Sequence, residues 1–179
     1  SDFSLASTGF QPNKTVLGGD IELDYSLVLK VKADHRVYLK GSIKDYYTGF
    51  SWTNTNRQEY SISGYIIEDY VTDTYFSSRI FFYHLLHRLG YRDPKLYGMY
   101  DNLFLTGLAE VEHVDFKTNT LFHAGNLIEL QEDKYNKEYI ITNSNAEFYF
   151  PGDQKGDNKY RFKYRIVDMN NPLTEELIK

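Results

Sequence analysis

Apolar side chains recur at every second position in several short segments of the chain, which is the period of a β-strand with one buried face. The first such segment alternates Leu27, Leu29, Val31 and Ala33 with Ser26, Val28, Lys30 and Lys32. A turn at 34–36 separates it from a second segment at 37–43. We therefore predict a β-hairpin over residues 27–45.

The same period predicts further strands after this hairpin. They lie at 57–71, 110–116, 120–131, 139–143, 146–150 and 160–168, with a bend at Ala124-Gly125. The last of them alternates aromatic with basic side chains, so one of its faces is predicted to point into the core. That face carries Tyr160, Phe162, Tyr164 and Ile166.

One stretch follows a different period, because its apolar residues recur at the spacing of an α-helix. The helix is predicted to run from about Ser78 to Leu89, with Gly90 at its C-terminal cap. Its apolar stripe consists of Phe81, Phe82, Leu85, Leu86 and Leu89. We predict that the stripe packs against the sheet as a lid, the alternative being an exposed patch for a partner. A second short helix is predicted within 94–105.

Many short strands separated by turns, with one helical excursion, indicate a mainly β fold. We predict an antiparallel β-sandwich or partly open barrel with one inserted helical segment at about 77–105. Residues 1–179 are predicted to form a single domain, in which 1–19 are an extended lead-in and 170–179 begin a linker. The 17 tyrosines and 12 phenylalanines support a sheet, because aromatic residues favour its half-buried surface.

Composition narrows the range of partners and chemistry. The 20 basic and 25 acidic residues give a formal net charge of −5 without a basic block, so nucleic acid is not an expected partner. The absence of cysteine excludes disulfides, a thiol nucleophile and thiolate metal ligands. The chain holds no run of about 18 apolar residues that could span a bilayer, and no cofactor is expected.

The sequence contains no complete catalytic motif. His84 and His87 share one face of the predicted helix, but no third ligand can be named, so a surface pair is favoured over a metal site. His113 and Asp115 share a strand face, yet no turn marks a nucleophile for them. Adjacent carboxylates are interpreted as solvated surface rather than as the acid and base of a glycosidase. These pairs are Glu68-Asp69, Glu132-Asp133 and Glu175-Glu176.

The remaining candidate is an aromatic cluster beside a glycine turn at 47–49. It consists of Tyr46, Tyr47, Phe50 and Trp52, the last being the single tryptophan of the chain. We favour a Trp52 that fills the core while the tyrosines keep their hydroxyls in water, because a buried ring contributes roughly 1.5–3 kcal/mol. The alternative is an exposed face that docks a sugar or a peptide. The two interpretations differ in the exposure of Trp52.

Three segments carry a resemblance to a known family. They are LGGDIELDYSLVLKVKA at 17–33, YLKGSIKDYYTGFSW at 38–52 and TLFHAG at 120–125. In this order they resemble the extracytoplasmic, pre-catalytic N-terminal domain of bacterial membrane-anchored transglutaminase-like proteins of the TgpA type. The chain departs from the family pattern at three places: Lys40 replaces an arginine, Phe50-Ser51 replaces a small residue, and Ala124 replaces a proline.

The resemblance implies a role without catalysis. The family's Cys-His-Asp triad lies C-terminal to the matching region and this chain has no cysteine, so no catalytic residue is carried over. The implied function is a non-catalytic accessory or interaction domain outside the cytoplasmic membrane, tethered through segments absent from this chain. Its implied partners are the transglutaminase-like core of the same polypeptide and a cell-wall or protein substrate.

Two other functions are considered beside this one. The first is a cell-wall glycan- or peptide-binding module that uses the Tyr46–Trp52 aromatic face. The second is an independent hydrolase, which would require a concave pocket with convergent polar groups and ranks last.

Overall fold

The computed structural model describes residues 27–55, 58–63, 67, 78–114, 117–133, 139–152 and 158–178. The strands are β1 (Leu29–Ala33), β2 (Leu39–Lys40), β3 (Tyr46–Tyr47), β4 (Trp52–Thr53), β5 (Glu59–Ser63), β6 (Phe104–His113), β7 (His123–Ala124), β8 (Asn126–Asp133), β9 (Tyr139–Asn143), β10 (Phe148–Tyr149) and β11 (Lys159–Val167). The helices are α2 (Ser78–Arg88), α3 (Pro94–Tyr97), the 3-10 helix η2 (Tyr100–Leu103) and α4 (Pro172–Ile178). The prediction of a mainly β fold with one helical insertion is confirmed.

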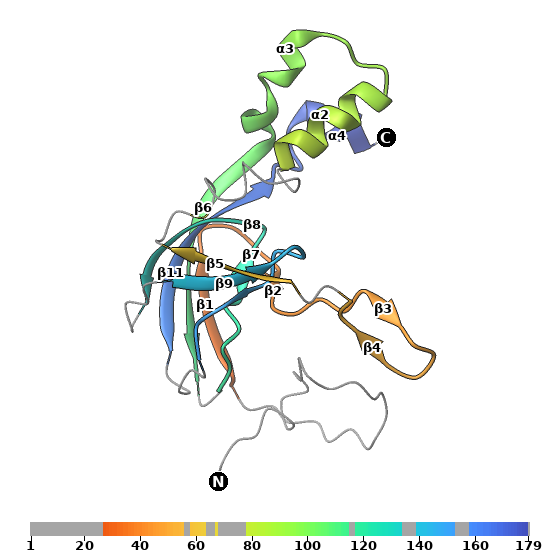
Figure 1. The fold of residues 1–179 in the computed structure, drawn as a ribbon. Helices are drawn as coiled ribbons and strands as arrows, with labels where there is room; N and C mark the ends of the chain where they lie inside the picture. Colours follow the sequence, from red (N-terminus) through yellow and green to blue (C-terminus); the bar gives the residue numbers. More distant parts are fainter. Residues whose placement is uncertain are drawn as a thin grey trace.

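Two antiparallel sheets form the body of the domain (Figure 1). The larger has the strand order β1-β6-β11-β8 and the smaller the order β10-β9-β5. The pairs β2-β7 and β3-β4 form two further short ribbons. The Ile67 N–H donates to the Ile128 carbonyl at 2.8 Å, which ties the segment after β5 to β8 of the larger sheet.

The core lies between these sheets and is built from both of them. The predicted inward face of 160–167 is confirmed, because Tyr160, Phe162 and Tyr164 are buried and Ile166 packs against them. Their neighbours in this cluster are Ile62, Ile67, Ala109, Val111, Leu121, Ala124, Leu127, Leu130, Ile140, Phe148 and Phe150. Large rings from both sheets thus meet aliphatic side chains, which removes much apolar surface from water.

The predicted hairpin over 27–45 is wrong. Strand β1 pairs with β6, where Leu29 lies opposite His113, and β2 pairs with β7 instead. The turn at 34–36 does not reverse the chain onto β1, because Asp34 is bound to Leu108 of β6: its N–H donates to the Leu108 carbonyl at 3.1 Å, and its carboxylate accepts the Leu108 N–H at 2.8 Å. Val31 on this edge strand is exposed.

Helix α2 confirms the predicted helix, and its C-terminus ends as expected. The Tyr91 N–H donates to Leu86 O at 3.0 Å and the Gly90 N–H to His87 O at 3.2 Å, which is the bonding of a Schellman motif. Gly90 takes a φ of +84°, the left-handed conformation that this cap requires. The second predicted helix within 94–105 is present as α3 and η2, after which β6 begins at Phe104, earlier than predicted.

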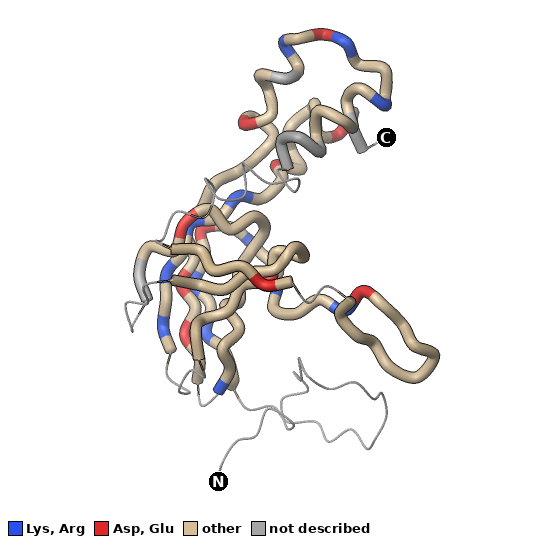
Figure 2. The backbone as a smooth tube through the Cα atoms, viewed as in Figure 1, with Lys and Arg blue, Asp and Glu red and all other residues tan. Residues whose placement is uncertain are grey.

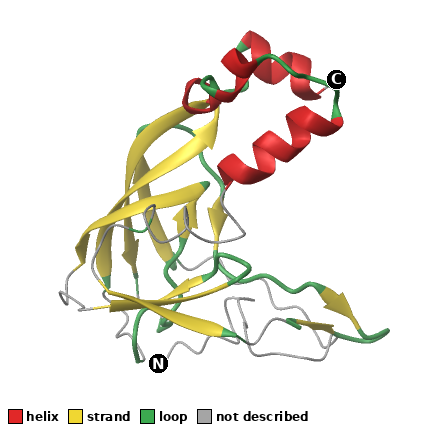
Figure 3. Ribbon diagram, turned by 45° about the horizontal axis from the view of Figure 1, so that its top comes forward, coloured by secondary structure: helices red, strands yellow, loops and turns green. Residues whose placement is uncertain are grey.

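The predicted lid over the sheet is wrong. Phe82 and Leu86 of α2 are buried, but against Tyr100 and Leu103 in a separate helical cluster, with Leu173 of α4 packed on it. This cluster lies beyond the ends of β6 and β11, beside the sheets rather than over them (Figures 1 and 3). The side chains of residues 81 and 85 lie outside the described set, and Leu89 is exposed. The helices thus form a second hydrophobic core beyond the ends of β6 and β11, the two longest strands.

Residues 172–178, at the predicted start of a linker, form α4. Its Leu173 packs in the helical cluster. The Asn171 side-chain amide also donates to the Asn102 carbonyl at 2.7 Å, which joins this helix to η2.

Candidate functional site

The β3–β4 hairpin carries the aromatic cluster. Tyr47 lies opposite Trp52 in the strand register. At the turn, the Thr48 N–H donates to the Ser51 carbonyl at 2.8 Å, and Gly49 takes a φ of +99°. Glycine accepts this φ without the steric cost that a side chain brings, so the sequence Thr-Gly-Phe-Ser closes the ribbon here.

The hairpin projects from the body of the domain (Figure 1), and its rings are exposed to water. Tyr46, Tyr47, Phe50 and Trp52 are between 45% and 66% exposed, Trp52 being the least. The favoured prediction that Trp52 fills the core is therefore wrong. A two-stranded ribbon has no second layer of structure against which a ring can be buried, whereas each main sheet has the other.

The rings are partly organised by contacts with one another. The centroids of Tyr47 and Trp52 lie 5.2 Å apart with their planes tilted by 38°, within the range of a favourable aromatic pair. The Tyr47 hydroxyl donates to the Gly49 carbonyl at 2.6 Å, which holds the ring along the hairpin. The pair therefore forms a bent apolar surface rather than a flat one.

The hairpin contains no charged residue from position 46 to position 55. Figure 2 shows no Lys, Arg, Asp or Glu along this stretch, and Lys44 and Asp45 precede it at its base. Asp45 accepts hydrogen bonds from the Thr55 hydroxyl at 2.7 Å and the Thr55 N–H at 2.8 Å. These bonds favour the charged carboxylate and hold the pKa of Asp45 below its ordinary value, so the charge is used to close the hairpin.

A buried polar group lies where the hairpin joins the body. Glu147, in the turn between β9 and β10, is fully buried. Its carboxylate accepts from the Ile43 N–H, from the Asn54 side-chain amide at 2.8 Å and from the Asn143 side-chain amide at 2.6 Å. The sequence reasoning missed this group, because a single glutamate in a polar turn carries no signal of burial.

The predicted histidine pair is a surface pair. His84 and His87 are exposed on α2, and the Arg92 guanidinium donates to His87 Nε2 at 2.9 Å. Within the described ranges, no group of three or more His, Cys, Asp or Glu side chains could hold a metal ion. Both imidazoles lie at the surface of α2, as the interpretation as a surface pair expected.

Among the other catalytic candidates, the structure describes the side chains of His113 and Glu175. His113 is buried against the rings of Phe122 and Tyr160, and its burial lowers its pKa to about 4. Its predicted neighbour at 115 and the carboxylate pair at 68–69 lie outside the described residues, as do the side chains at 132, 133 and 176. Glu175 is exposed.

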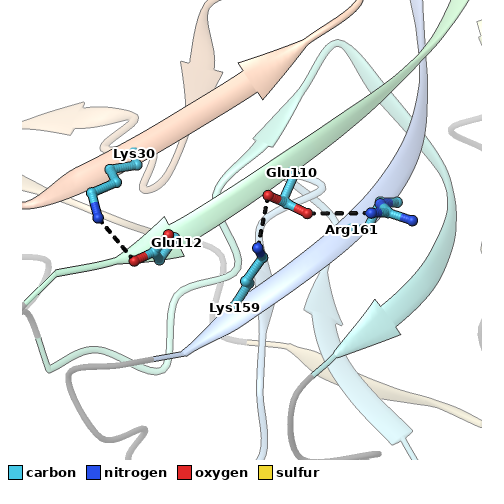
Figure 4. A network of polar contacts seen from close by, with 5 residues as sticks. All are labelled: Lys30, Glu110, Glu112, Lys159 and Arg161. Carbon is cyan, nitrogen blue, oxygen red and sulfur yellow. Dashed lines mark hydrogen bonds and ion pairs between the residues drawn. The ribbon is translucent and has the colours of Figure 1, made fainter.

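The outer face of the larger sheet is strongly charged, but its charges are paired across strands (Figure 4). Glu110 on β6 meets Lys159 at 2.9 Å and Arg161 at 3.3 Å, and Glu112 meets Lys30 at 3.1 Å. The hydrogen bond from Lys159 is the main reason that the pKa of Glu110 lies below its ordinary value. Charges of alternating sign are typical of solvated surface, and these five residues form no patch of a single sign.

Comparisons of the chain with protein-family models, with curated proteins and with solved structures found no match. The resemblance to TgpA-type transglutaminase-like proteins, with the location and partners it implies, therefore stays a prediction. Over the part of the chain that the structure describes, no helix combines the length and the apolar character needed to cross a membrane.

Proposed function

We propose that this domain is a non-catalytic binding module that docks an uncharged glycan on the β3–β4 hairpin. The observation that carries the proposal is the exposure of Tyr46, Tyr47, Phe50 and Trp52 on a projecting ribbon. Isolated exposed apolar side chains are ordinary, but exposed large rings in contact with one another, such as Tyr47 and Trp52, are a feature of interaction sites. Aromatic rings also supply much contact area at a low cost in side-chain entropy.

The chemistry of the hairpin favours a neutral ligand. A nucleic acid or another polyanion would need lysine or arginine beside the rings, and positions 46–55 hold neither. A pyranose ring presents an apolar C–H face that packs on an aromatic ring and hydroxyls at its rim. The Tyr47 hydroxyl, which donates to the Gly49 carbonyl, can accept a hydrogen bond from that rim. The bent Tyr47–Trp52 surface suits two successive sugars of a chain better than one flat ring.

The proposed setting follows from the resemblance to transglutaminase-like proteins. Outside the cytoplasmic membrane, a hairpin that grips cell-wall glycan would hold the neighbouring core of the same polypeptide near its substrate. In this proposal the domain contributes localisation and orientation, and the reaction takes place elsewhere in the protein. The gain would arise from effective concentration, as in any pair of linked binding units.

The single tryptophan makes the proposal directly measurable. We expect N-acetylglucosamine oligosaccharides to change the emission of Trp52, since its ring would exchange water for sugar, and we expect the protein to co-sediment with purified peptidoglycan. Phe50→Ala should weaken both signals by about tenfold, which corresponds to about 1.4 kcal/mol. Tyr38→Ala is the matched control, because Tyr38 is strongly exposed and lies outside the hairpin.

The outcomes separate glycan from other ligands. The proposal fails if the unaltered protein shows neither response, or if Phe50→Ala and Tyr38→Ala sediment equally. It also fails if free stem peptides release the protein from peptidoglycan while oligosaccharides do not. That result would identify a peptide as the ligand.

A further inference from the structure

We infer that Glu147 is a positioning residue that fixes the aromatic hairpin relative to the sheets, so that the rings are presented on a rigid arm. The consequence for ligand binding rests on the proposed function. The mechanical part of the inference rests on the hydrogen bonds of the hairpin root alone.

One carboxylate holds both legs of the hairpin. Ile43 precedes β3 and Asn54 follows β4, and each donates an N–H to Glu147. The Asn54 side chain is bound a second time, since its oxygen accepts from the Asn145 side-chain amide at 3.3 Å. The turn between β9 and β10 is therefore hydrogen-bonded to the ribbon at both of its ends, before β3 and after β4.

The turn itself is built to aim this carboxylate inward. The Asn143 side-chain oxygen accepts the Asn145 N–H at 3.0 Å and the Glu147 N–H at 3.2 Å, which closes the turn on itself. Ala146 takes a φ of +51°, a left-handed conformation that is unfavourable for a residue with a side chain. Such a conformation persists only where surrounding bonds hold it, and here it turns Glu147 towards the hairpin root.

A cation lies close enough to Glu147 for their charges to interact. Lys40 is bound in the same turn, its ammonium donating to the Asn145 carbonyl at 2.6 Å. Burial lowers the pKa of Lys40, and the negative charge of Glu147 opposes that shift. Burial also raises the pKa of Tyr149 above its ordinary value, with further contributions from the charge of Glu147 and from a hydrogen bond to it. A buried carboxylate with these partners is tolerated, whereas removal of one partner is costly.

The hairpin depends on this root because its strands make no other ladder. Among the described residues, β3 and β4 pair with each other and with no strand of the two main sheets. An isolated two-stranded ribbon is marginally stable in water. Its direction is therefore set by the contacts at its base, which Glu147 gathers into one group.

Glu147→Gln tests the inference with almost no change of shape. Both oxygens of Glu147 accept from N–H donors, but a glutamine can accept at one end only and must point its own N–H₂ at a donor on the other. We expect the hairpin to gain independent motion on the nanosecond scale. Time-resolved fluorescence anisotropy of Trp52 should show about a doubling of the amplitude of its fast component.

A second variant and a control keep the test decisive. Asn54→Ala removes one leg from the carboxylate without placing a mismatched donor in the interior, so it decides the question if Glu147→Gln fails to fold. Glu112→Gln is the control, because Glu112 is bound at the surface by Lys30 and lies on β6, in a different sheet from the hairpin. The inference is overturned if a folded Glu147→Gln or Asn54→Ala protein keeps the Trp52 anisotropy of the unaltered chain.

Peptidoglycan binding of the same proteins separates this inference from the proposed function. We expect about tenfold weaker retention of Asn54→Ala, since a mobile arm must be ordered on binding. If the unaltered protein does not bind peptidoglycan but Asn54→Ala increases the fast motion of Trp52, the proposed function fails and the positioning role stands. If the unaltered protein binds, and both variants match it in binding and in the anisotropy of Trp52, only the positioning role fails.

Discussion

The two aromatic regions of this protein use the same side chains with opposite results. On β11, Tyr160, Phe162 and Tyr164 are completely or almost completely buried. On the β3–β4 hairpin, Phe50 is 66% and Trp52 45% exposed. Both regions carry phenylalanine and tyrosine rings on or beside β-strands, so the type of residue alone does not separate buried from exposed rings.

The difference lies in what faces each strand. Strand β11 is an inner strand between β6 and β8, and the smaller sheet covers its inward face. The hairpin has only its own partner strand and no covering layer. Burial of a ring therefore depends on a second layer built from distant segments, and a ring without that layer remains available to a ligand.

The largest effect is expected when a phenylalanine of the buried region is replaced by alanine. Phe162→Ala should lower the free energy of unfolding by about 3–5 kcal/mol, because it opens a cavity between Tyr160 and Tyr164. Urea denaturation followed by far-UV circular dichroism measures it. A loss below about 1 kcal/mol, the average of ordinary point substitutions, would contradict the described core.

Acidification should weaken the buried region with a smaller effect. Burial lowers the pKa of His113 and of His123 from 6.5 to about 4, and the charge of Lys40 adds to the shift at His123. Between pH 6.5 and pH 4 the two histidines are protonated in the unfolded chain but stay neutral in the folded protein. The free energy of unfolding therefore falls as the pH drops through this range. The loss is at most roughly 2–3 kcal/mol per histidine.

His113→Phe provides the comparison for this pH effect. The variant keeps a ring against Phe122 and Tyr160 but cannot take up a proton. Urea denaturation at pH 7, 6, 5 and 4.5 should give a shallower loss for the variant than for the unaltered protein, while carboxylate titration is common to both. Parallel curves would mean that the folded protein protonates His113 without penalty.

The smallest effect is expected when a phenylalanine of the exposed hairpin is replaced by alanine. Phe50→Ala should alter the free energy of unfolding by no more than about 0.5 kcal/mol, because the Phe50 ring has little contact to lose. The urea experiment used for Phe162→Ala applies without change. A loss of several kcal/mol would show that the hairpin is part of the folded core and would remove the basis of the proposed function.

Local features of the fold were predictable because their causes lie within a few residues. The alternation in 160–167 and the helical spacing before Gly90 each describe one element, and both were confirmed. The partner of β1 was not predictable, since Asp34 is bound to Leu108, 74 residues away. The four ring residues of the site could be named from the sequence, but their exposure was predicted wrongly.

The hairpin root shows the same limit more sharply. Glu147 meets Asn54 and Ile43 across 93 and 104 residues. In the sequence it is one glutamate among 25 acidic residues, in a polar turn where exposure is the ordinary expectation. The residues next to Glu147 in the sequence do not indicate that it is buried.

By itself, the sequence determined a mainly β chain, the position of its helical segment, the inward face of β11 and an uncharged aromatic turn. Only the tertiary structure decided which strands pair, that the helices pack with one another beyond β6 and β11, and that the Tyr46–Trp52 rings stay in water on an arm held by Glu147. The reason is physical. Periodicity records which face of an element is apolar, whereas burial and hydrogen-bond partners depend on segments far away in the chain that come to lie against that face.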